Sequence, residues 1–275
     1  MPKPSIKTFK EAVDAYENSL NRSNVGAIEA QLIKPLTNPL EDAKRQSYLA
    51  VVKMCEYLNS WKGAADTEFL KHVQHDLHDI QERIESNAEL RPFAYLVAYA
   101  RGFVFRGQGR HKEAFEAFEK SAELDKDFFR ADAQKAAQQI YLDHLPEAKR
   151  LIEIAIRKTP PTSPAFANEK WTAARIEFFL GHYKAAIDLL DESIKLNDDL
   201  WYTVAYQCSA YSHIGRDKEA EQLLTVLENK FGIKTLQDII DREKLNPTAG
   251  SKSVDAGRRH LHDGLVKAGL RSSKY

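Results

Sequence analysis

The 275-residue chain contains little of what would mark a disulfide-stapled, zinc-bound or membrane-spanning protein. Its two cysteines, Cys55 and Cys208, lie far apart and offer neither a disulfide framework nor the paired spacing of a zinc site. No segment approaches the roughly 18 apolar residues that a membrane-spanning helix needs. The start, Met-Pro-Lys-Pro-Ser, lacks the apolar run of a signal peptide. We therefore expect a cytoplasmic protein without a membrane partner.

Charge of either sign is not in excess, because Lys plus Arg and Asp plus Glu number 40 each. A general nucleic-acid binder needs a basic face, so the composition argues against that class. The sequence also lacks a Gly-x-x-x-x-Gly-Lys-Ser/Thr loop, a Gly-x-Gly-x-x-Gly fingerprint after a strand, a His-Glu-x-x-His motif and a Gly-x-Ser-x-Gly elbow. These absences predict a protein that is not an enzyme and that binds no cofactor.

What the chain does contain is a helical hairpin pattern, clearest between residues 102 and 125. Gly102 stands three residues before Phe105, Gly109 breaks the helix, and Ala114 and Phe118 open the next helix. Glycine suits a helix C-terminus because it adopts the left-handed conformation without a Cβ clash. The pattern therefore predicts two antiparallel helices in which a small residue on one helix faces a large residue on the other.

The hairpin pattern recurs three more times. The second-helix alanine returns at steps of 34, 38 and 34 residues, as Ala148, Ala186 and Ala220. The turn residue returns as Asp143, Gly181 and Gly215. The small residue of the first helix returns as Ala136, Ala174 and Cys208. The first-helix aromatic returns only as Tyr211, with Gln139 and Glu177 in the two middle hairpins, so the register of those two first helices stays open.

These residues resemble the tetratricopeptide repeat, a 34-residue helical hairpin with Gly-x-x-Tyr, Ala-x-x-x-Phe and a closing proline. Here the closing proline is present only as Pro160. The resemblance implies an all-α solenoid of stacked hairpins. It places four repeats within residues 93–231, at about 95–128, 129–162, 167–200 and 201–231. The first helices of such an array line a concave surface that binds other proteins.

The regions on either side of the repeats are also predicted to be helical. Residues 1–92 contain four amphipathic stretches, at about 5–20, 25–36, 40–61 and 66–86. These either continue the stack as degenerate hairpins, which we favour, or form a capping bundle. Residues 232–275 predict a C-terminal cap, in which Thr235 begins a short helix, 246–253 is a loose linker and 254–270 is the last helix.

The last helix carries a second resemblance. The ending Arg259-His-Leu-His-Asp-Gly-Leu-Val-Lys-Ala-Gly-Leu270 is similar to the tail that follows tetratricopeptide arrays in some bacterial cyclase-type and winged-helix regulators. The resemblance implies a bacterial source and a regulatory relative. It covers about a dozen residues, and no cyclase or DNA-binding pattern precedes the array in this sequence.

The partner-binding surface is predicted from the repeat phase. The projected side chains are rich in Tyr, Trp, Phe and Arg, which carry most of the binding energy at interfaces, and the two arginines suit a carboxylate. A clamp of lysines and asparagines for a C-terminal carboxylate is not indicated, because the predicted positions on the first helix of the first repeat are Leu96, Tyr99 and Phe103, with no Lys or Asn. Individual aromatics can instead pack the hairpins. The predicted partner-binding residues are Leu96, Tyr99, Phe103, Arg130, Gln134, Tyr141, Asn168, Trp171, Arg175, Phe179, Tyr202, Tyr206 and His213.

One cluster outside the repeats has metal-ligating residue types. His72, His75, Asp76 and Asp79 crowd one side of a predicted helix, and imidazole with carboxylate is a donor set for zinc or a similar ion. The alternative is a solvated face opposite an apolar stripe. We favour the solvated face, because a single helix rarely completes a closed site, and we predict no bound metal.

Three functions are consistent with these patterns. The first is a scaffold or adaptor whose concave face binds a peptide or helix of another protein. The second is a regulatory or sensor module of a bacterial signalling or transcription system, self-associating as a homodimer. The third is a metal-dependent activity at the His72–Asp79 helix. We favour the scaffold, because an all-helical repeat chain without catalytic motifs is most often a binding module, although fold alone does not decide function.

Overall fold

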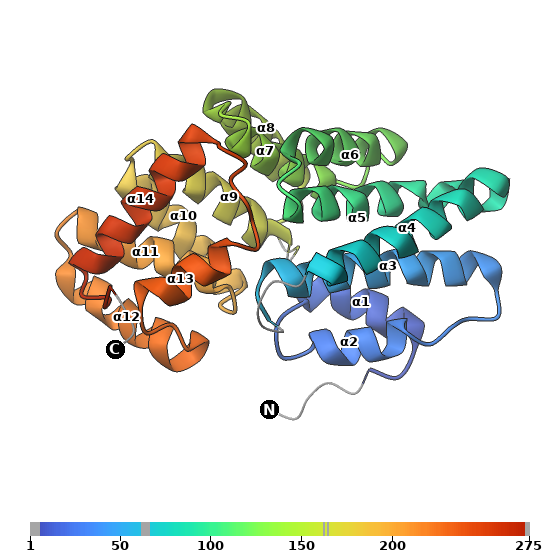
Figure 1. The fold of residues 1–275 in the computed structure, drawn as a ribbon, viewed down its shortest axis with the longest axis horizontal. Helices are drawn as coiled ribbons and strands as arrows, with labels where there is room; N and C mark the ends of the chain where they lie inside the picture. The colour runs from blue at the N-terminus through green and yellow to red at the C-terminus, as the bar shows by residue number, and fades with distance from the viewer. Residues whose placement is uncertain (1–5, 62–66, 162, 164, 273–275) are drawn as a thin grey trace. The chain divides into compact units, whose positions relative to one another are not determined.

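The computed structural model describes residues 6–61, 67–161, 163 and 165–272. Within these residues the chain forms fourteen α-helices and one 3-10 helix, and no strand (Figure 1). None of the described helices combines the length and the apolar character needed to cross a membrane. The chain divides into two compact units, unit 1 with Met1–Gln134 and Leu245–Pro247, and unit 2 with Lys135–Lys244 and Thr248–Tyr275. The predicted boundaries at 92/93 and 231/232 follow repeat phase rather than compactness, and they stay a prediction.

Unit 1 holds the four predicted N-terminal helices and the first repeat hairpin. Its helices are α1 (Phe9–Ser19), α2 (Val25–Leu32), α3 (Pro39–Leu58), α4 (Thr67–Ser86), the 3-10 helix η1 (Ala88–Phe93), α5 (Ala94–Gly107) and α6 (His111–Leu124). Thr8 begins α1 through a capping box with Glu11. The start of this helical stretch predicted at about residue 5 lies outside the described residues. The second helix ends at Leu32, four residues before the predicted end at Leu36.

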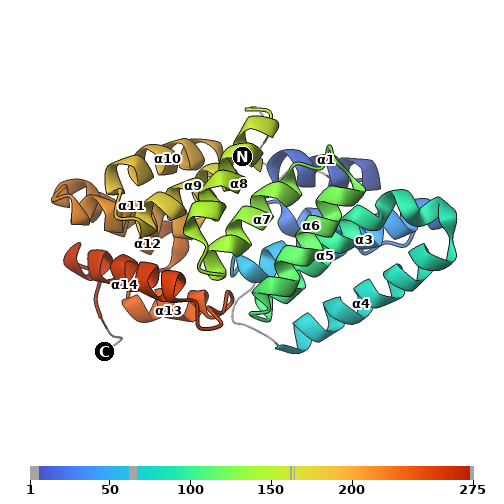
Figure 2. The same ribbon diagram turned by 90° about the horizontal axis from the view of Figure 1, so that it is seen from above.

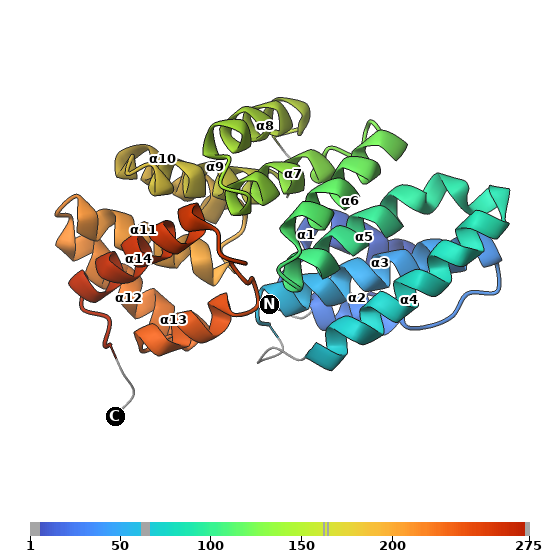
Figure 3. The same ribbon diagram turned by 45° about the horizontal axis from the view of Figure 1, so that its top comes forward.

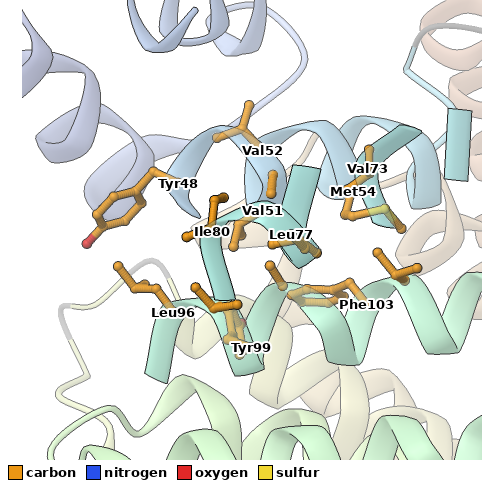
Figure 4. Packing of buried hydrophobic residues seen from close by; sticks show 14 of the residues in the cluster. Tyr48, Val51, Val52, Met54, Val73, Leu77, Ile80, Leu96, Tyr99 and Phe103 are labelled. Atoms are coloured by element: carbon orange, nitrogen blue, oxygen red, sulfur yellow. The ribbon is translucent and has the colours of Figure 1, made fainter. Parts of the chain in front are cut away.

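The core of unit 1 forms where α3, α4 and α5 meet. Figure 4 shows Val51 of α3, Leu77 and Ile80 of α4, and Leu96 of α5 in the space between the three helices. All four side chains are at most 4% exposed. The apolar stripes predicted for α3 and α4 are therefore core-facing, as side chains three and four positions apart share one face of a helix.

Unit 2 holds the remaining repeats and the C-terminal helices. The helix α7 (Arg130–Tyr141) begins at the end of unit 1, and α8 (Leu145–Lys158), α9 (Ala165–Phe179), α10 (Tyr183–Leu196), α11 (Trp201–His213), α12 (Asp217–Phe231), α13 (Leu236–Glu243) and α14 (Lys252–Lys267) follow. The hairpins α9–α10 and α11–α12 pack side by side through α10 and α11 (Figure 2). Gly232 ends α12 at φ 68°. Thr235 begins α13, as predicted, and does so through a capping box with Asp238.

The predicted repeat phase is confirmed at its turns and at its packing positions. The four turn residues Gly109, Asp143, Gly181 and Gly215 all have φ between 63° and 77°. The four second-helix alanines are fully buried. In the first hairpin a Cβ atom on Gly102 would lie 2.5 Å from the ring of Phe118, so only glycine lets this ring seat against α5. The small-for-large packing inferred from the sequence is thus present.

The structure also explains the two middle hairpins, where the first-helix aromatic is missing. In the outer hairpins the aromatic ring lies against an arginine five residues later, with Arg110 Cζ 4.5 Å from the Phe105 ring centroid and Arg216 Cζ 4.5 Å from that of Tyr211. An arginine over an aromatic face is held by the ring quadrupole. The first-helix position therefore contacts the residue that precedes the second helix.

In the middle hairpins the same i, i+5 contact is a hydrogen bond. Nδ1 of His144 lies 2.8 Å from Oε1 of Gln139, and Nδ1 of His182 lies 2.8 Å from Oε2 of Glu177. Gln139 and Glu177 thus occupy the positions of Phe105 and Tyr211. The register left open by the sequence is fixed by this exchange of a cation–aromatic contact for a hydrogen bond.

Candidate functional site

The C-terminal helix α14 lies against the first helices of the last two hairpins, α9 and α11 (Figures 1 and 3). A Cβ atom on Gly264 would lie 2.8 Å from the backbone oxygen of Ser209 and 2.9 Å from Nε2 of His213. A Cβ atom on Gly257 would overlap the ring of Phe179. We call the surface formed by Phe179, Ser209 and His213 the α14-binding face.

Apolar and polar contacts together hold α14 on this face. Leu261 and Leu265 are fully buried within the core of unit 2. The backbone oxygen of His260 accepts from Ser209 Oγ at 3.2 Å and lies 2.8 Å from His213 Nε2. Lys267 Nζ donates to the backbone oxygen of Ser212 at 2.7 Å. The buried leucines therefore set how closely α14 packs on the face, and the hydrogen bonds set its position along α11.

Sequence reasoning predicted the last helix but not where it packs. A usable signal was present, because Gly257 and Gly264 stand seven residues apart inside a helix, with Leu261 between them. Glycine in a helix interior is unfavourable by about 0.5–1 kcal/mol relative to alanine, so two on one face indicate a close helix approach. The contacts with Phe179 and Ser209 show that approach.

The N-terminus of α14 is tied to the turn between α7 and α8. The carboxylate of Asp143 accepts from the backbone N–H groups of Lys252 at 3.1 Å and Ser253 at 2.7 Å, and from Ser251 Oγ at 2.7 Å. Ser251 is 3% exposed, and its Oγ in turn accepts from Val254 N as the helix cap. The prediction of a loose linker is therefore wrong at residues 251–253, since these hydrogen bonds fix the backbone there.

The hydrogen bonds to Asp143 give the docking of α14 a dependence on pH. Desolvation opposes the charged form, but the donors of Ser253, Ser251 and Lys252 outweigh it and lower the pKa of Asp143 to about 2. A lowered pKa stabilises the fold above the unfolded value near 3.8 and loses that contribution as pH falls toward 2. Replacing Asp143 with Asn keeps the left-handed turn and removes the charge.

We expect Asp143→Asn to lower the stability of unit 2 by about 0.5–1 kcal/mol at pH 7, a small cost because the carboxylate is exposed. The difference in the free energy of unfolding between parent and variant should disappear between pH 4 and pH 2, as Asp143 of the parent becomes protonated. Urea unfolding followed by the fluorescence of Trp171 and Trp201, both in unit 2, measures it. If the parent and the variant lost stability in parallel as the pH falls, Asp143 would not be the group responsible for this pH dependence.

The predicted partner-binding residues of unit 1 lie in its core. Leu96, Tyr99, Phe103 and Gln134 are each at most 5% exposed. Tyr99 and Phe103 stack edge to face at 4.9 Å between ring centroids, which is core packing. Arg130 is half-buried and donates to the backbone oxygen of Glu17 at 2.7 Å. The expectation that Leu96, Tyr99, Phe103 and Gln134 lie on an open surface is therefore wrong. For the three residues of α5 the cause is that α3, α4 and α6 pack around this helix.

Several of the predicted residues of unit 2 come together, also mostly buried. Tyr141, Trp171, Arg175 and Tyr206 are at most 8% exposed, so an open surface is wrong for them as well. The half-buried members are Asn168, Phe179, Tyr202 and His213. Phe179 and His213 contact α14, which occupies the side that was predicted to be free. Whether any of the set binds a partner stays a prediction.

Trp171 is the centre of an aromatic cluster within this set. Its ring centroid lies 4.7 Å from that of Tyr202 and 4.9 Å from that of Tyr206. Burial raises the pKa of Tyr206, and the nearby charge of Arg175 acts in the opposite direction. The cluster therefore joins α9 to α11.

Arg175 is the most unusual member of the set. Its Cζ lies 4.8 Å from the ring centroid of Tyr141 and 5.4 Å from that of Phe179, so the guanidinium contacts two aromatic rings. The side-chain nitrogens Nε and Nη2 are buried and have no hydrogen-bond acceptor among the described residues. Aromatic faces favour a cation but provide no lone pair for its N–H donors.

The histidine cluster of α4 lies on an exposed face. His72, His75, Asp76 and Asp79 are all exposed, opposite a buried apolar stripe. Nδ1 of His75 lies 3.4 Å from Oδ2 of Asp79, and the two side chains are 74% and 58% exposed. In the part of the chain that the structure describes, no three His, Cys, Asp or Glu side chains converge on one point. The exposed arrangement is that of a solvated helix face.

Comparison with known proteins agrees with the hairpin geometry. The family model described as tetratricopeptide repeat matches residues 97–128, which span α5 and α6. No curated protein matches the chain. A thermophilic tetratricopeptide-repeat protein of Thermus thermophilus is 13% identical with a TM-score of 0.52, covering 82% of this chain and 99% of its own. PilW, described as a widely conserved type IV pilus biogenesis factor, is 12% identical with a TM-score of 0.52, covering 77% and 90%.

At such low identities these likenesses concern the fold alone. They support a tetratricopeptide-repeat protein and confirm the predicted fold class, all-α with tetratricopeptide-type hairpins. The similarity of the C-terminal tail to bacterial cyclase-type and winged-helix regulators stays a prediction, as do the bacterial source and the cytoplasmic location.

Proposed function

We propose that the protein is an interaction scaffold without catalytic activity, and that unit 2 binds an amphipathic helix of a partner protein on the α14-binding face. The observation that supports this proposal is α14 itself. A helix already occupies the first-helix side of the last two hairpins, with Gly257 and Gly264 against Phe179 and Ser209. The resident helix therefore supports a ligand of the same chemistry, an amphipathic helix with small residues on one face.

The partner helix is specified by the positions that α14 places on the face. Glycine or another small residue is needed where Gly264 meets the backbone of α11, because a side chain there would collide with a carbonyl group. Leucines are needed at the positions of Leu261 and Leu265, which are fully buried. Docking an amphipathic helix through such anchors is an established mode of peptide recognition.

Binding of a partner helix requires that α14 leave the face. Attachment to the same chain gives α14 a high effective concentration there, so an external helix binds well only when α14 is loosened or when the external helix binds more tightly. The same exchange between two copies of the chain would produce a homodimer, which connects the scaffold to the regulatory alternative.

The test uses the full-length protein and a fluorescently labelled peptide of residues 252–270. Gly264→Leu loosens the chain's own helix, so we expect this variant to bind the peptide at least about tenfold more tightly than the parent, measured by anisotropy. Gly26→Leu is the matched control, because Gly26 is an exposed residue of α2 with nothing within 4 Å of its Cβ position.

Two further measurements decide between outcomes. A peptide with leucine in place of Gly264 should not bind, because it carries the same clash. Light scattering of the parent and of Gly264→Leu reports whether α14 is exchanged between copies. Failure of the loosened variant to bind the unmodified peptide while remaining monomeric would remove the proposed function.

A further inference from the structure

The buried guanidinium of Arg175 lacks hydrogen-bond acceptors within the described residues for two of its nitrogens, Nε and Nη2. The residue is 6% exposed. Buried charged donors are usually paired, because an unpaired one loses its hydration without compensation. The nearby acidic side chain Glu243, whose charge also acts on Tyr206, contacts Arg258 and His262 instead.

The resident helix α14 supplies no acceptor at this point. Where it meets Phe179, the ring that lies on the guanidinium, it carries Gly257. The neighbouring core position one turn earlier on the helix is Val254, which is 2% exposed and apolar. The contacts of α14 with its face therefore leave Nε and Nη2 of Arg175 without an acceptor among the described residues.

We infer that the helix that this face is built to bind carries a carboxylate, from Asp or Glu, at or next to the position of Gly257, where it pairs with Arg175. The inference rests on the proposed function and names the ligand's charge. A side chain at that position must displace the Phe179 ring, which covers the guanidinium. An acidic side chain that takes the place of the ring exchanges an aromatic contact for a charge-assisted hydrogen bond.

This difference in charge gives a partner helix an advantage over α14. A helix with a small residue at the position of Gly264 and leucines at those of Leu261 and Leu265, but with a carboxylate near Arg175, gains a buried ion pair that α14 does not make. The resident helix then occupies the face in the absence of a partner and yields to one that satisfies the arginine. The shape of the face favours an amphipathic helix with a small residue and leucines at the contact positions. Among such helices, Arg175 favours one that carries Asp or Glu beside it.

The inference is tested with three labelled peptides of residues 252–270, with Gly, Glu or Gln at position 257. Glu and Gln have nearly the same shape, so their difference isolates the charge. On the full-length Gly264→Leu protein we expect the Glu peptide to bind about 10- to 100-fold more tightly than the Gln peptide. In Gly264→Leu with Arg175→Met the ratio should return to about one.

The same interaction is measurable within one chain, without any peptide. Gly257→Glu and Gly257→Gln displace Phe179 equally, so with Arg175 present the Glu variant should have the higher urea midpoint. With Arg175→Met the midpoints should coincide. The difference should persist in 0.5 M salt, because a buried pair is screened far less than a surface pair.

The outcomes separate the two proposals. Binding of the unmodified peptide with no preference for Glu over Gln would overturn the role of Arg175 and leave the helix-binding face in place. A preference for Glu that survives Arg175→Met would also overturn it. If no peptide binds, the proposed function fails, and the single-chain comparison at position 257 still decides whether Arg175 accepts a carboxylate.

Discussion

Phe118→Ala is expected to lower the stability of unit 1 by about 3–5 kcal/mol, the range for removal of a fully buried phenylalanine. The ring is completely buried and lies edge to face against Phe103 and Tyr99, with centroids 5.2 and 5.6 Å away. Deleting it opens a cavity between α5 and α6 that rigid helix backbones cannot close. Urea unfolding with hydrogen-exchange mass spectrometry measures the loss and locates it in this hairpin.

The matched control lies on the same helix. Phe115 of α6 is only partly exposed rather than fully buried, so Phe115→Ala makes the same chemical change at a position of lower burial. We expect it to cost clearly less than Phe118→Ala. Equal losses at the two positions would mean that Phe118 is not the packing centre of the hairpin.

A double substitution tests the small-for-large packing directly. Gly102→Ala alone should destabilise unit 1, because the new Cβ atom would lie 2.5 Å from the Phe118 ring. In the Phe118→Ala background the obstacle is gone, and alanine should stabilise the helix by up to about 1 kcal/mol over glycine. The effect of one substitution thus changes sign with the other, whereas additive effects would contradict direct contact between the two positions.

The repeat architecture was predictable because it depends on steric rules that recur at a fixed spacing. Left-handed turns need glycine or a tolerant residue, and close helix pairs need a small residue opposite a large one. The register of the middle first helices was not predictable in this way. Gln139 and Glu177 replace an aromatic by hydrogen-bonding His144 and His182, and this compensation is invisible to a pattern of apolar residues.

The candidate site was only partly predictable, for a different reason. The repeat phase placed Arg175 and Phe179 on one side of their helix, but it does not say what covers that side. The cover is a helix whose contacts are some 50 residues away in sequence, such as His260 with Ser209. The position of this helix depends on Gly257 and Gly264. A pattern of apolar residues does not register glycines, so it could not predict where the helix packs.

Gly264→Leu is expected to release α14 from its face and to lower the stability of unit 2 by at least about 3 kcal/mol. The backbone oxygen of Ser209 is part of α11 and cannot turn away from a new Cβ atom 2.8 Å distant, so the whole of α14 must move outward. The move returns Leu261 and Leu265 to water, at about 1.5–3 kcal/mol for each fully buried side chain.

Release of the helix has a direct chemical readout. Trypsin cleaves after Arg258 and Arg259 of α14, and a docked helix resists cleavage because its backbone is held in place. In Gly264→Leu we expect rapid cleavage there, whereas Gly26→Leu should remain resistant and unfold within about 1 kcal/mol of the parent, since leucine favours a helix over glycine. If Gly264→Leu were as resistant and as stable as the parent, α14 would not depend on close contact with α11, and a partner helix would have no reason to carry a small residue at that position.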